Sequence, residues 1–179
     1  EGILRGMHRL PEGAGPTPQV QLLGSGTILN EVRAAAEVLR DEFDVQASVW
    51  SVTSFTELRR DGLEAERWNL LHPAEPARNA YVSQQLAPVP TVAATDYIRT
   101  LPDLIRQWVP GPYRTLGTDG FGRSDRRAAL RDFFEVDRRW IAVAALRELA
   151  AAGEIGADVV SAALRRFEID SETPPPVSR

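Results

Sequence analysis

The sequence has 179 residues, the length of one domain and enough to bury a full hydrophobic core. Hydrophobic residues make up 43% and charged residues 26%, which is typical of soluble globular proteins rather than of disordered chains. The net charge of −4 argues against nucleic acid as the main partner, and the absence of Lys and Cys excludes Schiff-base chemistry, disulfides and Cys-ligated metals.

Strand and helix patterns alternate through the first half of the chain. In chain order we expect a strand over Ile3–Leu10, a loop over Pro11–Pro18 and a buried strand over Val20–Leu23. A turn at Gly24-Ser25-Gly26 then leads into a helix from Thr27 to Phe43. A buried strand over Ala47–Val52 follows, and then a broken helix over Phe55–Leu71 that Pro73 stops. His72–Arg78 is predicted to be a loop.

The second half begins with two more strands and ends in helices. In chain order we expect a short helix over Tyr81–Leu86, a strand over Thr91–Thr95, a helix reaching Val109 and a strand over Tyr113–Gly117. Three helices follow: one from its N-cap Ser124 to Phe134, one from its cap Asp137 to Gly153, and one over Asp158–Phe167. The tail over Ser171–Arg179 is expected to be disordered. This alternation predicts an α/β fold with a largely parallel sheet covered on both faces.

No stretch approaches the roughly 18 apolar residues of a membrane-spanning helix, and the N-terminus lacks a signal peptide, so we expect a cytoplasmic protein without membrane partners. The chain opens without Met in an apolar run, which suggests a piece of a longer protein.

Two glycine-containing turns follow predicted strands. Gly24-Ser25-Gly26 lacks the third glycine of a dinucleotide fingerprint, because position 29 is Leu, and a tight turn explains it without a ligand. Gly117–Asp125 is more distinctive: it carries three glycines within six residues and follows a strand's carboxyl end, where α/β proteins tend to bind ligands. A plain strand-to-helix loop with caps at Asp119 and Ser124 is the alternative.

The sequence contains no recognisable catalytic constellation. There is no Gly-x-Ser-x-Gly elbow, and His8 and His72 are the only histidines. The thiamine diphosphate motif, Gly-Asp-Gly followed by Asn, is also absent, because Thr118 precedes Asp119 and every Asn lies upstream. We therefore predict no catalytic, cofactor-binding or metal-binding residue in this chain. The candidates for an interface or for the surroundings of a site are Asp119, Gly120, Arg123, Ser124, His72 and Trp68.

Five segments, in order along residues 1–170, resemble one family, the C-terminal domain of the homodimeric bacterial pyruvate dehydrogenase decarboxylating component. They are Val20–Gly26, Ser51–Leu58, Glu66–Pro73, Ala94–Tyr97 and Leu116–Asp125. Arg67-Trp68-Asn69 and Gly117–Asp125 are the most specific, and the former distinguishes the chain from a transketolase that acts on sugar phosphates. The tail over residues 171–179 lies outside the resemblance.

The resemblance implies a three-layer α/β/α sandwich with a mixed five-stranded sheet whose first strand is antiparallel. It further implies an enzyme in which thiamine diphosphate and Mg²⁺ lie between two other domains, so that this domain supports the dimer without catalysing the reaction. The implied partners are those two domains, a second subunit and the dihydrolipoyl acyltransferase of the complex. The alternative is a separately encoded, non-catalytic module that binds a ligand or a partner, and the DNA upstream of Glu1 distinguishes the two.

Overall fold

The fold is built on one mixed sheet of five strands. The computed structural model describes residues 1–13 and 17–179. The strands are β1 (Met7–Gly13), β2 (Val20–Gly24), β3 (Ala47–Val52), β4 (Thr91–Ala94) and β5 (Tyr113–Leu116). Their order in the sheet is β1-β3-β2-β4-β5, with β1 antiparallel to β3 and every other pair parallel. The predicted mixed sheet with an antiparallel first strand is confirmed.

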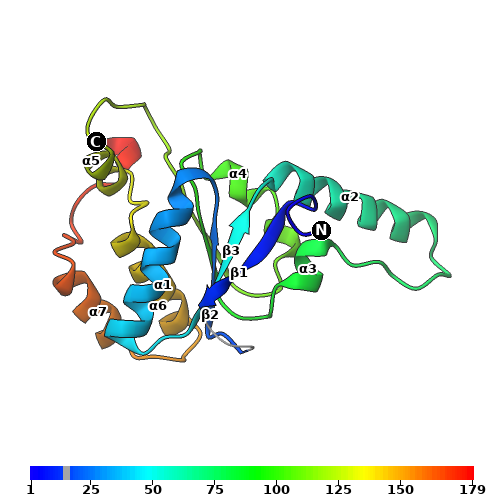
Figure 1. Ribbon diagram of the computed structural model, residues 1–179, viewed down its shortest axis with the longest axis horizontal. Coiled ribbons are helices and arrows are strands. Elements are labelled where there is room, and N and C mark those ends of the chain that lie inside the picture. Colours follow the sequence, from blue (N-terminus) through cyan, green and yellow to red (C-terminus); the bar gives the residue numbers. More distant parts are fainter. Residues whose placement is uncertain (14–16) are drawn as a thin grey trace.

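Helices cover both faces of this sheet (Figure 1). They are α1 (Leu29–Phe43), α2 (Phe55–Leu71), α3 (Tyr81–Gln85), α4 (Thr100–Asp103), α5 (Arg127–Phe133), α6 (Arg138–Ala151) and α7 (Ala157–Arg166). Short 3-10 turns occur at Gly26–Ile28 (η1), Arg106–Trp108 (η2) and Pro176–Ser178 (η3).

Alternation along the strands produces two separate hydrophobic cores. Leu22 and Val49 point to the face covered by α1 and α6, with α7 packed outside them. Leu23 and Trp50, the next residues along the same strands, point to the opposite face, where α2, α3 and the segment around Trp108 pack. Since successive side chains of a strand point to opposite faces, apolar residues at consecutive positions are required in a sheet covered on both sides. The predicted three-layer sandwich is therefore confirmed.

The first strand starts and ends later than its pattern predicted. Residues 2–6 form turns, and β1 runs from Met7 through Pro11 to Gly13. Pro11 has no N–H to donate, but β1 lies at the edge of the sheet and its register with β3 shifts between Arg9 and Gly13, so the missing donor is tolerated. Of the loop predicted over Pro11–Pro18, residues 14–16 lie outside the described residues.

Two helical predictions need correction. The stretch Phe55–Leu71 is one continuous helix rather than a broken one; the Ser54 hydroxyl caps it by accepting from the Glu57 N–H. The single helix predicted to reach Val109 is instead the short α4 and the turn η2. Pro102 causes part of this difference, because a residue without an N–H fits only within the first turn of a helix.

The C-terminal helices match their predicted positions, with one wrong cap. Asp137 caps α6 by accepting from the Arg139 and Trp140 N–H groups, and Gly153 follows its end with φ of 79°. The helix predicted to start at Ser124 starts at Arg127 and has no side-chain cap, because Ser124 lies outside the first turn in an exposed loop.

Candidate functional site

The carboxyl ends of β2, β4 and β5 lie next to one another and carry the loops singled out by the sequence. From β2 the chain crosses to β3 on one side, and later returns past β2 to form β4 and β5 on the other. The ends of β2 and β4 therefore form a topological switch point, where strand connections diverge to opposite sides. Open α/β sheets typically bind ligands in the crevice at such a point.

Hydroxyl groups tie the three loops together. The buried Ser25 hydroxyl, after β2, donates to Thr95 Oγ1, after β4, at 2.8 Å. The Thr118 hydroxyl, after β5, donates to the Asp96 carbonyl at 2.8 Å, and the Thr27 hydroxyl donates to the Asp96 carboxylate at 3.2 Å. These bonds connect residues 22 to 70 positions apart, so the sheet edge presents one continuous surface.

Asp119 holds the loop after β5 against the segment before α4. Its carboxylate accepts from the Arg99 backbone N–H at 2.8 Å and from Arg99 Nε at 2.6 Å. Burial alone would raise the pKa of Asp119, but the hydrogen bonds and positive charge of Arg99 outweigh it and hold that pKa below its usual value. Both carboxylate oxygens are thus used in a structural contact.

Asp119→Asn is expected to lower the free energy of unfolding by about 1 kcal/mol, because the amide keeps one acceptor but loses the ion pair with Arg99. Urea unfolding measures the difference. Asp125→Asn is the matched control, since among the described residues its exposed carboxylate accepts from the adjacent Arg126 N–H alone. A control that loses as much stability as Asp119→Asn would contradict the assigned role.

A cavity of about 580 Å³ opens at the switch point, between the strand ends and α5. Its polar lining comes from Thr27, Asp96, Thr118, Arg123, Asp125, Arg127 and Arg131. Its apolar lining comes from Ile28, Leu130, Phe134 and Val136. The volume and the mixed lining are those of a small-molecule site. We call this space the switch-point cavity.

Glu31 on α1 fixes the wall of the cavity that α5 and α6 form. Its buried carboxylate pairs with Arg131 Nη1 at 2.7 Å and with Arg138 Nε at 2.9 Å, and it also accepts from the Arg138 backbone N–H. Burial alone would raise the pKa of Glu31, but the hydrogen bonds and charges of Arg138 and Arg131 hold it below its usual value. One carboxylate thus joins three helices.

The other predicted residues of the Gly117–Asp125 loop lie at the rim. Gly120 has φ of 97°, and a Cβ there would approach Val177 Cα at 3.3 Å, so the loop needs glycine where the tail crosses it. The Arg123 guanidinium stacks on the Phe133 ring at 3.9 Å. Ser124 is exposed and caps nothing, so its predicted role as an N-cap is wrong.

The C-terminal tail contacts this same region. Its sequence predicted disorder, whereas in the structure Arg179 donates to the Phe133 carbonyl at 3.2 Å and to the Glu135 carboxylate at 2.9 Å. Its guanidinium thereby satisfies a carbonyl at the end of α5, which has no partner within the helix. The domain boundary at residue 170 stays a prediction.

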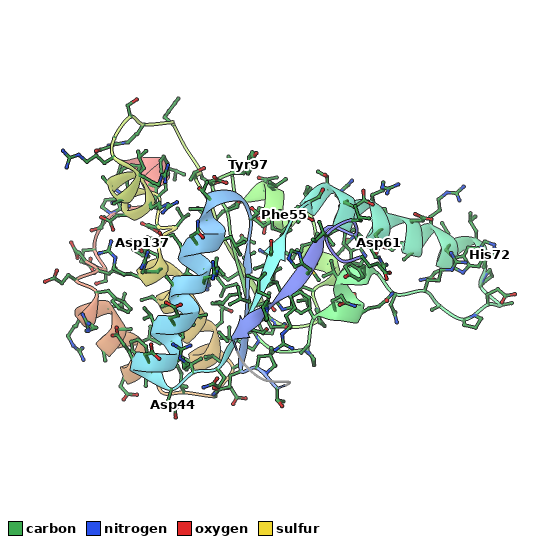
Figure 2. The ribbon with its side chains drawn as sticks, in the orientation of Figure 1. Asp44, Phe55, Asp61, His72, Tyr97 and Asp137 are labelled. Atoms are coloured by element: carbon green, nitrogen blue, oxygen red, sulfur yellow. The ribbon has the colours of Figure 1, made fainter. Side chains whose placement is uncertain are left out.

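Trp68 and His72 do not join this site. They lie at the far end of α2, which projects beyond the sheet as an arm (Figure 2). Their rings stack at 3.6 Å, Arg78 covers the other face of Trp68 at 3.3 Å, and Asn69 pairs with the Arg78 backbone. Trp68 therefore anchors the loop after α2 and belongs to neither hydrophobic core.

Trp68→Ala is expected to lower the free energy of unfolding by only about 1–2 kcal/mol, because its half-buried ring makes one stacking and one cation–π contact. The 72–79 loop should become more sensitive to limited proteolysis. Arg67→Ala, next to it on the exposed face, is the control. A loss above about 3 kcal/mol would instead indicate a core residue.

Several residues that shape the site escaped the sequence analysis. Glu31 reads as an ordinary charge in a helix, and its arginine partners lie a hundred residues later. Asp96 and Arg127 carry no motif. For Asp96, the one usable signal in the sequence was its position closely after a buried strand, because ligands tend to bind at the carboxyl ends of such strands.

The described part of the chain contains neither a cluster of metal ligands nor a helix that could span a membrane. Over residues 1–13 and 17–179, no three His, Asp or Glu side chains come together in a way that could hold a metal ion. Within the same ranges, no helix combines the length and apolar character needed to cross a bilayer. Asp119 is the acidic residue whose neighbours come closest to the thiamine diphosphate motif. Both of its carboxylate oxygens accept from Arg99, so it does not fit the role of a metal ligand.

Comparison with known proteins shows that the chain belongs to one family of protein domains. The family described as the transketolase-like TK C-terminal domain matches residues 6–137. The pyruvate dehydrogenase E1 component of Pseudomonas aeruginosa is 53% identical over 96% of this chain, and that of Escherichia coli K12 is 51% identical over 96%. The chain spans about a fifth of the length of these relatives (20% of each).

A solved structure agrees on the fold. Transketolase from Leishmania mexicana superposes with a TM-score of 0.56 at 19% identity, over 97% of this chain and 20% of its own. The part of these proteins that resembles the chain is thus a small portion of a much longer protein.

Proposed function

Because this chain belongs to the family of transketolase-like C-terminal domains, we propose that it is the C-terminal domain of a pyruvate dehydrogenase E1 component. In this proposal the whole protein decarboxylates pyruvate and reductively acetylates the lipoyl group of an acyltransferase. The observation that supports it most directly is an identity of about half over nearly the whole chain with curated proteins of that name. The sequence identity with these proteins is far higher than the sequence identity with the transketolase of similar fold.

The domain would contribute to assembly rather than to the chemistry. Thiamine diphosphate and Mg²⁺ would supply the decarboxylation chemistry from a site in the other domains. The residues of this chain do not fit that group, because Asp119 is held by Arg99 and no cluster of metal ligands occurs among the described residues. The enzyme would act in the cytoplasm as a homodimer, with the acyltransferase as a further partner.

Two exposed apolar regions support contacts with the rest of such a protein. Phe121, in the loop after β5, is 94% exposed, and Leu70, at the end of α2, is 78% exposed. Side chains of this size are usually covered in the assembled protein when they gather on a protruding loop or arm. We therefore keep Asp119, Gly120, Arg123 and Ser124 on the first region, and Trp68 and His72 on the second, as candidates for an interface or for the surroundings of a site.

A chimera tests the proposal. The matching fifth of the Pseudomonas aeruginosa relative would be replaced by this chain, and pyruvate decarboxylation would be measured together with subunit assembly. We expect a dimer with activity within about tenfold of the parent, since conservative changes at packed interfaces are usually tolerated. A chimera that assembles like its parent but has no activity would contradict the proposal.

The chain by itself is expected to bind no thiamine diphosphate and to decarboxylate no pyruvate. Calorimetric titration with the cofactor and Mg²⁺ should give no heat above that of dilution, and the parent relative serves as the positive control. A saturable isotherm in the micromolar range would show that the cofactor site lies within this chain.

A further inference from the structure

The switch-point cavity is lined by two arginines whose side-chain N–H groups remain available for a ligand. No ion pair or hydrogen bond of the Arg123 or Arg127 side chain occurs within the described residues, and the Arg123 guanidinium lies over the Phe133 ring at 3.9 Å. The third arginine of the lining, Arg131, is already paired with Glu31. Arg123 and Arg127 therefore leave two forked donors available at the rim, a geometry that suits the oxygens of a phosphate.

The two acids of the lining are placed differently. Asp125 lines the cavity together with Arg123 and Arg127, and its carboxylate accepts from the Arg126 N–H. Among the described residues, the Asp96 carboxylate accepts from the Thr27 hydroxyl alone, at 3.2 Å, so it has lone pairs available for the hydroxyl groups of a ligand. The lining thus offers arginine donors for an anionic group and, at Asp96, an acceptor for hydroxyl groups.

The remaining wall is apolar. Ile28 and Val136 are almost completely buried beneath it, and Leu130 and Phe134 on the α5 side complete it. A wall of this kind favours a flat or aliphatic group that leaves water on binding. The cavity volume, about 580 Å³, falls inside the range of about 300–1,000 Å³ common for small-molecule sites.

We propose that the switch-point cavity binds a nucleoside phosphate. The phosphate would lie on Arg123 and Arg127, the sugar hydroxyls would donate to Asp96, and the base would pack against Leu130. The proposal is independent of the function proposed above, because it concerns a cavity formed entirely by this chain. Its location at the carboxyl ends of β2, β4 and β5 is the one expected for a ligand in this type of sheet.

Titration calorimetry of the 179-residue chain tests the proposal with adenosine and guanosine 5′-monophosphates as probes. We expect saturable binding of at least one of them, at one site per chain, with a dissociation constant below about 1 mM. Adenosine should bind at least about tenfold more weakly because it lacks the phosphate, and ribose 5-phosphate should do so because it lacks the base.

Matched variants identify the site. Arg127→Gln removes an exposed cation and should weaken binding about tenfold while leaving the melting temperature of the free chain unchanged. Arg67→Gln removes an equally exposed cation from α2, far from the cavity, and should leave binding unchanged (Figure 1).

Absence of saturable heat with both monophosphates would overturn the proposal, and so would unchanged affinity in Arg127→Gln. If ribose 5-phosphate or inorganic phosphate binds as tightly as the monophosphates, the base makes no contact and the assignment to nucleoside phosphates is wrong.

Discussion

Gly62→Val is expected to lower the free energy of unfolding by about 3 kcal/mol or more, the largest effect of any single change considered for this chain. Gly62 lies in the middle of α2 with its backbone against the indole ring of Trp108, and a Cβ there would overlap that ring. The Trp108 ring is itself buried, and its indole N–H donates to the Glu66 carboxylate, on the next turn of α2, at 2.9 Å. The ring therefore cannot move aside without losing both its packing and this hydrogen bond.

Chemical denaturation measures this loss, and Gly122→Val is the matched control, because nothing lies within 4 Å of a Cβ at that position. If the two variants are equally stable, the close packing of α2 on Trp108 does not exist in solution. A selective loss in Gly62→Val would establish that the base of the α2 arm is held rigidly to the second core.

Glu31→Gln is expected to lower the free energy of unfolding by about 1.5–3 kcal/mol, because the buried carboxylate makes charged hydrogen bonds with Arg131 and Arg138. Glu37→Gln, on the exposed side of the same helix, is the control and should change stability by less than about 0.5 kcal/mol. The substitution should also disturb the wall of the switch-point cavity, because Arg131 lines the cavity and Glu31 holds the Arg131 side chain in place.

The Glu31 contribution also has a definite pH dependence. The pKa of this group is lower in the folded chain than its ordinary value of 4.5, so folding favours the ionised form. Its stabilisation is therefore complete above the unfolded pKa and is lost as the pH falls through the folded pKa. The difference in unfolding free energy between the native chain and Glu31→Gln should be constant near neutrality and shrink below about pH 4.5. A difference that stays constant down to pH 2 would contradict the buried ion pair.

Local patterns predicted most of the elements because each is determined over a few neighbouring residues. The apolar spacing of Ile28, Val32 and Leu39 predicted α1, and the alternation in Ala47–Val52 predicted β3 with the observed bounds. Asp137 was predicted as a cap because a cap needs only the N–H groups two or three positions later. Ser124 failed by the same rule, since nothing local reveals where a glycine-rich loop ends and a helix begins.

The sequence by itself determined the alternation of strands and helices, the double-sided burial of the sheet and the absence of Cys chemistry, because these depend on residue type and short-range spacing. Only the tertiary structure decided that Trp68 and His72 lie on an arm away from the Gly117–Asp125 loop, that Asp119 holds Arg99, and that Glu31 meets arginines from two later helices. The switch-point cavity belongs to this second group. It exists because strand order brings Thr27, Asp96 and Thr118 to one edge, and no pattern within a single segment encodes contacts between residues about 70 to 100 positions apart.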